Sequence, residues 1–341
     1  MTAIETVAAA SGVDEGGYVL AVDGGGSKTD VVAVGLDGRV LSRRRGPSSS
    51  PQLLGVTRAL EVLDVLAGGI VDELAPRRLL QTNVYLAGLD TPEEIHALRH
   101  AAAHRTWMTS AAVVDNDMFA LLRAGTSSPD AVAVVVGTGI NAVGVRADGA
   151  TERFPAIGEI SGDWGGGAVL GGAALWHAAR AEDGRGPATS LQQLVPAALG
   201  RPDVRSVTLD LHFGRLPRSC VPELSPVLFA AATAGDAVAA GVVLRQGDEV
   251  VAMARALLTR LDLVGKPVPV VLGGGVLAAQ NPLLMDRIRH GLAAHVPLAA
   301  PQVVTELPIL GSALLALESA GVRGPTVSEQ FHTHEGEEQG E

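Results

Sequence analysis

Three glycine turns follow three apolar strands in this sequence, and each could bind phosphate. The turns lie at 24–26, 137–139 and 273–275. Glycine lets backbone N–H groups approach a ligand without a Cβ in the way, which suits contact with phosphate oxygens. One such turn is weak evidence, whereas three in one chain are more specific. The sequence has no GxxxxGK[ST], which excludes a P-loop enzyme, and the first turn lacks the third glycine and following helix of a dinucleotide fingerprint.

Asp23 ends the first apolar strand, directly before the turn at 24–26. A carboxylate in this position faces bound phosphates and repels them unless a cation lies between the two charges. A Mg²⁺ ion held through water removes the conflict, so we expect Asp23 to act through this metal. Lys28 and Thr29 follow the turn and are candidate donors to phosphate. The alternative is that Asp23 only stabilises its turn.

The segment Asp115-Asn116-Asp117 lies between a predicted strand and a predicted helix, where functional side chains of α/β folds collect. Phosphoryl transfer from ATP to a hydroxyl needs a carboxylate that orients the hydroxyl and accepts its proton. Asp117 is the candidate for this role. The alternative is that either aspartate only caps the helix that follows.

The segment at 158–167, GEISGDWGGG, is rich in glycine, holds one aspartate and precedes a predicted helix. Asp163 is therefore a candidate ligand of sugar hydroxyls, and the alternative is again a helix cap.

The strands around the first two turns repeat. They are expected at 18–23, 30–36 and 39–42 around the first turn, and at 131–136 and 140–147 around the second. Hairpin turns at Asp37-Gly38 and Asp148-Gly149 lie at an offset of 111 residues, the same offset that relates Gly26 to Gly137. A strand–glycine turn–strand–hairpin unit used twice predicts a duplicated α/β domain, with chance similarity as the alternative.

The other elements follow from hydrophobic periodicity. Helices are expected at 53–74, 92–104 (with Thr91 as N-cap), 118–124, 165–181, 190–199, 224–232, 236–263, 282–295 and 308–320. Further strands are expected at 83–89, 111–115, 268–272 and 303–306.

Composition favours a soluble, globular protein of the cytoplasm. The chain has 341 residues, 47% of them hydrophobic, and no apolar run of the length that a membrane span needs. A formal net charge of −11 argues against nucleic acid as a partner. The single cysteine, Cys220, excludes an internal disulfide and a multi-cysteine zinc site. Residues 1–16 are expected to be a flexible arm, and 324–341 a disordered acidic tail.

Together these segments resemble the BadF/BadG/BcrA/BcrD ATPase family, which includes the N-acetylglucosamine kinases. The resemblance runs from about residue 18 to about 321. It rests on AVDGGGSKTDVVAV, VVDND, VVGTGINAVGV, GEISGDWGGG, VVLGGGV and PILGSALLAL. It implies the actin-like ATPase fold: two α/β lobes built on duplicated ribonuclease H-like domains. We expect an N-terminal lobe at 17–116, closed by a helix at 312–322, and a C-terminal lobe at 117–311.

The resemblance also implies roles for individual residues. Asp117 is the catalytic base, and Asp23 is the residue that acts on the metal. The expected ATP-binding residues are Gly24, Gly25, Gly26, Ser27, Lys28, Thr29, Gly137, Thr138, Gly139, Gly274 and Gly275. The expected sugar-binding residues are Ser50, Asp117, Thr138, Asn141 and Asp163.

The sequence departs from the family pattern at two positions. Kinases of this group usually have an asparagine where GPSSSP has Ser50. The usual GDEGS is here GDWGG, with Trp164 in place of the glutamate. Both departures concern the sugar pocket and leave the phosphate chemistry alone. Trp164 either offers an apolar face to the sugar ring or belongs to the core.

The sequence therefore predicts an ATP- and Mg²⁺-dependent kinase that phosphorylates a hydroxyl of an amino sugar, N-acetylglucosamine or a related N-acetylated sugar. The alternative is an ATPase that activates a 2-hydroxyacyl-CoA dehydratase, which would need cluster-binding cysteines beyond Cys220. A sugar-responsive repressor would need a DNA-binding arm, and an actin-like structural protein would form filaments. A small-molecule sugar is the expected partner, with neither nucleic acid nor membrane, and a homodimer is left open.

Overall fold

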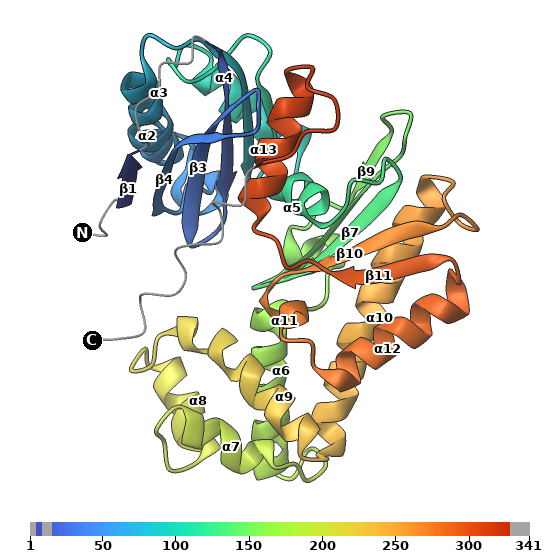
Figure 1. Cartoon of the computed structure of the whole chain (residues 1–341). Helices are drawn as coiled ribbons and strands as arrows, with labels where there is room; N and C mark the ends of the chain where they lie inside the picture. The colour runs from blue at the N-terminus through green and yellow to red at the C-terminus, as the bar shows by residue number, and fades with distance from the viewer. Residues whose placement is uncertain (1–4, 9–15, 328–341) are drawn as a thin grey trace. The chain divides into compact units, whose positions relative to one another are not determined.

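The computed structural model describes residues 5–8 and 16–327, which divide into two compact units. Of the described residues, unit 1 comprises 5–8, 16–127 and 305–327, and unit 2 comprises Ser128–Val304. The division falls about ten residues after the boundary predicted at 116, because the helix that begins at Asp117 packs within unit 1. Figure 1 shows the sheet and helices of each unit.

The sheet of unit 1 has the strand order β1-β4-β3-β2-β5-β6. The strands are β1 (Glu5–Ala8), β2 (Tyr18–Gly24), β3 (Lys28–Gly35), β4 (Val40–Pro47), β5 (Leu79–Leu86) and β6 (Val113–Asn116). Strands β2 to β4 form an antiparallel meander, and β5 and β6 run parallel to β2. Strand β1 lies within the segment expected to be a flexible arm, and the rest of that segment before residue 16 lies outside the described residues.

Both faces of this sheet are covered, because the side chains of a strand alternate between faces and both sets are apolar here. Leu20 and Val22 face a cluster with the helical segment α2 (Val56–Leu63), a π-helical turn (Asp64–Gly68), α3 (Gly69–Leu74) and α4 (Pro92–Ala102). Val19 and Ala21 face α13 (Pro308–Ser319) on the other side. Thr91 caps α4 as predicted, in a capping box with Glu94. A short helix α1 (Pro51–Leu54) precedes α2.

Helix α13 packs closely against α5 (Asp117–Gly125), as Figure 1 shows. A Cβ on Gly311 would overlap the backbone of Ala120, so only glycine lets the two helices approach this closely. Ser312 Oγ donates to the carbonyl of Val22 at 2.9 Å. These contacts fix the start of α5 relative to the end of β2.

The sheet of unit 2 has the order β11-β10-β7-β8-β9. The strands are β7 (Ala131–Val136), β8 (Ile140–Val145), β9 (Thr151–Arg153), β10 (Val268–Gly273) and β11 (Ala299–Val303). Strands β7 to β9 form an antiparallel meander, and β10 and β11 run parallel to β7. The five strands of this sheet thus have the same order and directions as strands β2 to β6 of unit 1. Gly38 and Gly149 occupy equivalent turns, with left-handed φ angles of 85° and 89°. The predicted duplication is confirmed.

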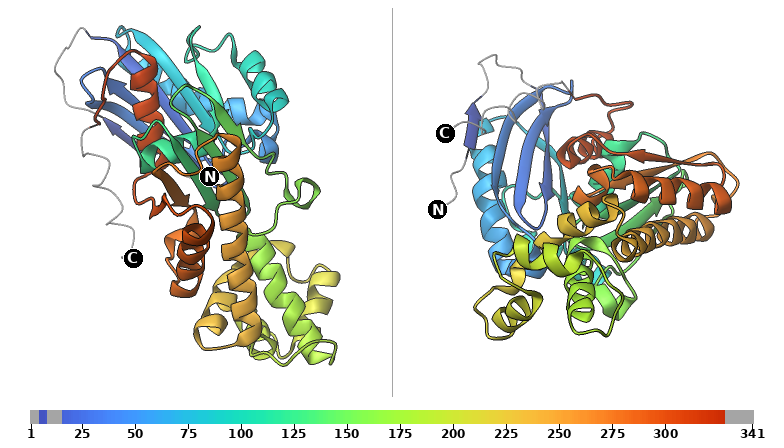
Figure 2. Two further views of the ribbon diagram at one scale, coloured as in Figure 1. Left: turned by 90° about the vertical axis from the view of Figure 1, so that its right-hand side faces the viewer. Right: turned by 90° about the horizontal axis from the view of Figure 1, so that it is seen from below.

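The helices of unit 2 are α6 (Gly166–Glu182), α7 (Leu191–Ala198), α8 (Val204–His212), α9 (Ser225–Thr233), α10 (Ala237–Arg260), α11 (Gly275–Ala278) and α12 (Pro282–His295). Figure 2 shows the long helix α10, which packs on α6, α9 and α12. Helix α8 and strand β9 were not predicted, and β11 lies four residues earlier than expected. Strand β11 contains Pro301, which an edge strand tolerates because one of its sides needs no ladder hydrogen bonds.

The first residues of the expected acidic tail, 324–327, are described, and a Cβ on Gly38 would overlap the carbonyl of Thr326. The remainder of that tail, 328–341, lies outside the described residues. Within the described chain no single helix is long and apolar enough to cross a membrane. The segments Arg218–Thr233 and Ala237–Arg260 have the length and apolar composition of a span only when taken together, and a bend of 113° separates them.

Candidate functional site

The turn between β2 and β3 presents unused backbone donors. Its ends are closed by a hydrogen bond from Gly25 N–H to the carbonyl of Lys28 at 2.9 Å. Among the residues that the structure describes, the amides of Gly26 and Ser27 make no backbone hydrogen bond. Both residues, like Lys28, are exposed. The turn can therefore offer two N–H groups and an ammonium to an anion.

A serine loop supports this turn from behind. Ser48 Oγ donates to the carbonyl of Gly25 at 2.9 Å, and Thr29 Oγ1 donates to Ser49 Oγ at 2.8 Å. A Cβ on Gly24 would overlap Ser49 Oγ, so glycine is required at this point of the turn. Thr29 is fully buried in this contact, so its side chain supports the turn.

Asp23 and Asp117 lie at the same end of the unit 1 sheet. Asp23 is the next-to-last residue of β2, and Asp117 begins α5 directly after β6, with β5 between the two strands. Burial, followed by the charge of Asp117 and then that of Asp30, raises the pKa of Asp23 to about 8, against a lowering by Lys28. Burial, followed by the charge of Asp90, raises the pKa of Asp117 to about 7. Both carboxyl groups thus take up a proton more readily than an ordinary aspartate, and a cation near them would lower both pKa values.

The helix cap at this point is Asn116, not either aspartate. Its Oδ1 accepts from Met118 N–H at 3.0 Å and its Nδ2 donates to Asp90 Oδ1 at 2.9 Å. The side chain of Asp115 points toward the backbone, where its Oδ1 accepts from the N–H of Asn116 at 2.8 Å. Asp117 is therefore not the N-cap of α5, although its carboxylate still accepts from backbone N–H groups at the start of the helix, an interaction that lowers its pKa against the effect of burial. The roles of Asn116 and Asp90 were missed, because only the fold brings the loop after β5 to the start of α5.

Ser50 is buried, with 2% of its surface exposed, at the N-cap of α1. Its hydroxyl makes no capping hydrogen bond to that helix, and a Cβ built on Gly88 would lie 2.9 Å from Ser50 Oγ. Since Ser48 and Ser49 hold the β2–β3 turn, Ser50 belongs to the same local structure as Asp23.

In unit 2, the turn between β7 and β8 is held by the N-terminus of α6. Gly167 N–H donates to the carbonyl of Gly137 at 2.8 Å, and Ala168 N–H to that of Thr138 at 3.0 Å. The turn is closed by a bond from Gly137 N–H to the carbonyl of Gly139 at 2.9 Å. Within the described part of the chain, the amides of Thr138 and Gly139 make no backbone hydrogen bond, and both residues are exposed. This turn also presents two free donors.

The third turn lies against the second. Gly274 has a φ of 86°, and a Cβ built on it would lie 2.5 Å from the carbonyl oxygen of Val136. Gly275 is exposed at the start of α11. Unit 2 thus gathers the predicted residues of the turns at 137–139 and 273–275, because β7 and β10 are parallel neighbours that end at the same edge.

Asp163 is held within its own loop. Its Oδ2 accepts from Gly158 N–H at 3.0 Å and from Ser161 Oγ at 2.5 Å. It does not cap α6, whose N-cap is Gly165, so the capping alternative is wrong here too. Asn141 Oδ1 accepts from the amide of Ala142 at 2.7 Å and lies half-buried on β8, close to the turn that contains Thr138.

Trp164 packs half-buried against the core of unit 2, and the guanidinium of Arg245 lies 3.9 Å from the centre of its ring. The core alternative for Trp164 is therefore favoured over an open face for a sugar ring.

The donor set of unit 1 fits a divalent cation that also binds phosphate. No group of three or more candidate metal-binding side chains occurs in the described segments. Mg²⁺ usually takes only one or two carboxylates and completes its shell with water and phosphate oxygens, so Asp23 beside Asp117 suffices.

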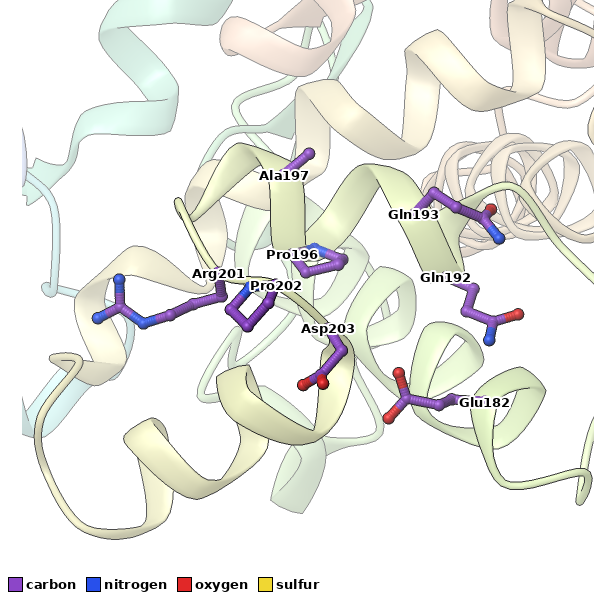
Figure 3. A pocket seen from close by; sticks show the side chains of 8 residues that line it. All are labelled: Glu182, Gln192, Gln193, Pro196, Ala197, Arg201, Pro202 and Asp203. Atoms are coloured by element: carbon purple, nitrogen blue, oxygen red, sulfur yellow. The ribbon is translucent and has the colours of Figure 1, made fainter.

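A separate pocket of about 290 Å³ lies between the ends of α6, α7 and α8 (Figure 3). Its acidic residues are engaged within the protein: Glu182 accepts from the amides of Val204 and Arg205, and Asp203 caps α8. It contains none of the residues predicted to bind ATP or sugar.

The model of the BadF/BadG/BcrA/BcrD ATPase family matches residues 20–316, which is most of the chain. The chain belongs to this family. It is 24% identical over 314 residues to an N-acetyl-D-glucosamine kinase of Dictyostelium discoideum, covering 88% of this chain and 98% of the relative. It is 26% identical over 283 residues to an N-acetylmuramic acid/N-acetylglucosamine kinase of Clostridium acetobutylicum, covering 82% and 92% of the two chains.

Solved structures confirm the expected fold. The structure of a proposed N-acetylglucosamine kinase of Chromobacterium violaceum matches the structure of this protein with a TM-score of 0.68 at 23% identity. The match covers 89% of this chain and 100% of the other. A ROK family glucokinase of Streptomyces griseus, solved with glucose and AMPPNP, matches with a TM-score of 0.51 at 17% identity, covering 89% and 100%. The fold is the duplicated α/β fold of the actin-like ATPases.

Proposed function

We propose that this protein is an ATP-dependent kinase that transfers the γ-phosphate of ATP to a hydroxyl of an N-acetylated amino sugar. The observation that carries the proposal is the placement of Asp117, half-buried at the start of α5, at the same end of the unit 1 sheet as Asp23. Family membership and two curated relatives that are named as N-acetylglucosamine kinases support the same reaction.

In this proposal Asp117 orients the acceptor hydroxyl and takes its proton as the oxygen attacks the γ-phosphorus. The new bond joins the sugar oxygen to the γ-phosphorus, and the bond from that phosphorus to the β,γ-bridging oxygen breaks, so ADP leaves. A carboxyl pKa of about 7 suits a base near neutral pH, because the group is ionised yet still takes a proton readily.

The exposed turn amides would hold the phosphates. Gly26 and Ser27 in unit 1, and Thr138 and Gly139 in unit 2, have N–H groups that are free within the described residues. Gly274 and Gly275 are the residues that we assign to the nucleotide beside the second turn. Hydrogen bonds from fixed backbone donors stabilise the charge that develops on the transferring group.

We further propose that Mg²⁺ accompanies ATP and is held by Asp23 through water. When bound, the ion supplies positive charge between Asp23 and the phosphates. For this chain's own residues the consequence is electrostatic: a cation at Asp23 favours the ionised form of Asp117 next to it.

Ser50 and Asp117 are the proposed sugar-binding residues of unit 1, and Thr138, Asn141 and Asp163 are those of unit 2. Ser50 offers a hydroxyl that no helix cap engages. We propose the cytoplasm as the compartment, because a chain with one cysteine needs no oxidising environment and the cytoplasm supplies ATP.

Cys220 does not support the alternative of a dehydratase activator. It is the only cysteine of the sequence, and it is buried in a 3₁₀ turn of unit 2. An exposed pair of thiolates is what a cluster shared between subunits needs.

The test is a screen of ATP consumption by the purified protein with N-acetylglucosamine, N-acetylmuramic acid, N-acetylmannosamine, glucose and no sugar. We expect ADP release that depends on an N-acetylated sugar, with a sugar phosphate identified by mass spectrometry. Equal ATP consumption with and without every sugar would contradict a kinase and favour a simple ATPase. Preference for glucose over all N-acetylated sugars would contradict the substrate class alone.

A further inference from the structure

Gln246 is a buried polar residue that no predicted motif contains. It lies on α10, is fully buried, and its Oε1 accepts from the N–H of Gly166 at 2.9 Å. A Cβ built on Gly165 would lie 2.5 Å from that same Oε1, and Gly165 has a φ of 134°. The glycines at the start of α6 therefore make room for this amide.

The contact continues from α6 into the turn between β7 and β8. A Cβ built on Gly166 would lie 2.5 Å from backbone atoms of Gly139, so the two glycines touch through their main chains. The next two amides of α6, those of Gly167 and Ala168, donate to the carbonyls of Gly137 and Thr138. The N–H groups of Gly166, Gly167 and Ala168, at the start of α6, are thus engaged by Gln246 and the turn.

A glutamine at position 246 lowers the stability of the core. Its Nε2 has no hydrogen-bond partner among the described residues, and a buried amide with an unmet donor is less stable than an apolar side chain of the same size. Methionine would fill this space without that cost. The amide is therefore best explained by what its Oε1 does, which is to fix the amide of Gly166.

We propose that Gln246 is a positioning residue for nucleotide binding. It sets the start of α6 and, through the main-chain contact of Gly166 with Gly139, aims the free amides of Thr138 and Gly139 at the phosphates. It does not touch ATP itself. This inference rests on the proposed function, because it requires the turn at 137–139 to bind phosphate.

The test is calorimetric titration of the full-length protein with a non-hydrolysable ATP analogue and Mg²⁺. Gln246→Met keeps the side-chain volume and removes the acceptor, and we expect it to raise the Kd for the analogue by about tenfold, the effect of losing about one well-placed hydrogen bond. Gly166→Ala pushes on Gly139 directly and should raise the Kd by a similar factor. Because both changes disturb one contact, the double variant should lose much less than the product of the two single effects.

Gln193→Met is the matched control, since Gln193 is exposed on α7 of the same unit. Its Kd should equal that of the wild type. A cooperative thermal unfolding transition of the Gln246→Met variant, measured beside the titration, separates a nucleotide-positioning role from general loss of structure. If Gln246→Met does not fold, Gln246→Asn takes its place, because its shorter amide cannot reach Gly166.

A wild-type Kd in the folded Gln246 variant, or fully multiplicative effects in the double variant, would overturn the inference and leave the kinase proposal intact. If the wild type itself binds no nucleotide, the proposed function fails and the inference fails with it. The wild-type titration therefore distinguishes the two failures.

Discussion

Asp23 and Asp117 come from segments 94 positions apart in the chain, and the charge of Asp117 is one of the causes that raise the pKa of Asp23 to about 8. The sheet order β2-β5-β6 brings them to one edge, and the packing of α5 against α13 holds the second carboxylate there. At a pH above these raised pKa values both groups are charged, and a cation near the pair would offset the repulsion between them.

Removal of the proposed base is the first prediction. Asp117→Asn keeps the shape of the side chain and its backbone contacts but cannot accept the proton. We expect kcat to fall by about 10²–10⁴-fold while the Kd for nucleotide changes little. Asp115→Asn is the control, because Asp115 is turned toward the amide of Asn116. Near-wild-type turnover in Asp117→Asn would move the role of base to Asp115.

The pH profile of kcat/KM reports the ionisation of Asp117. Since the base acts as a carboxylate and its pKa is raised to about 7 without metal, activity should fall as the pH drops, with the midpoint below 7 when Mg²⁺ at Asp23 favours the ionised form. The charge of Asp90 contributes to this rise. Asp90→Asn keeps an oxygen for the bond from Asn116 and removes the charge, so the acid limb should move to lower pH. If the acid limb of the pH profile does not move in Asp90→Asn, a group other than Asp117 controls that limb.

Asp23 should make the protein dependent on a divalent ion. We expect EDTA to abolish activity, and Asp23→Ala to raise the Mg²⁺ concentration needed for half-maximal rate. Because the folded pKa is raised above the ordinary value, the folded state holds more protons than the unfolded state between about pH 4 and 8. Without metal, thermal stability should therefore fall as the pH rises through this window, and Asp23→Asn should flatten the fall. Full activity without any divalent ion would remove the metal from the proposal.

Much of this fold follows from the sequence because its signals are local. Strand β2 is a continuous apolar run closed by glycines, and Thr91 with Glu94 forms the capping box that starts α4. Strand β9 is three polar residues long, Thr151–Arg153, and is recognisable only by its pairing with β8. Local pattern cannot identify a strand that is defined by its partner.

The same limit applies to the site. Asp23 and Asp117 each follow an apolar run, and so could be predicted from position alone. Asp90 and Gln246 carry no local signal, since what matters is the charge or hydrogen bond that each makes to a distant segment. The structure was also needed to choose between the capping and catalytic roles predicted for Asp117, because Asn116 and Asp117 are equally good helix caps by residue type.

Gly311 is predicted to be essential for stability. A Cβ at this position would overlap the carbonyl oxygen of Ala120 and lie 2.6 Å from the amide of Ala124, which would force α13 away from α5. We expect Gly311→Ala to lower the free energy of unfolding by about 1–3 kcal/mol in a urea titration. Gly241→Ala is the matched control: it is an exposed helical glycine with open space around it, so alanine should be neutral or stabilise by up to about 1 kcal/mol. Equal stability of the two variants would contradict the close packing.

Ser50 is predicted to tune the sugar that the enzyme accepts. Its hydroxyl is short, uncapped and close to Gly88, whereas the asparagine usual in this group reaches farther and offers both a donor and an acceptor. A polar group of the ligand that would hydrogen-bond to asparagine has no partner when serine is present. The missing hydrogen bond costs about 1–3 kcal/mol of binding free energy, or roughly 5- to 150-fold in affinity. A roomier site should tolerate a bulkier sugar.

We therefore expect Ser50→Asn to raise kcat/KM for N-acetylglucosamine and to lower it for a 3-O-substituted analogue such as N-acetylmuramic acid. Steady-state titrations of wild type and variant with both sugars measure the two changes. Ser48→Asn tests whether any asparagine in the loop has this effect. It should impair both sugars alike, because Ser48 holds the carbonyl of Gly25 and thereby the phosphate turn. Equal changes for both sugars in Ser50→Asn would show that position 50 does not set specificity, since a contact specific to the acetamido sugar must discriminate between the two substrates.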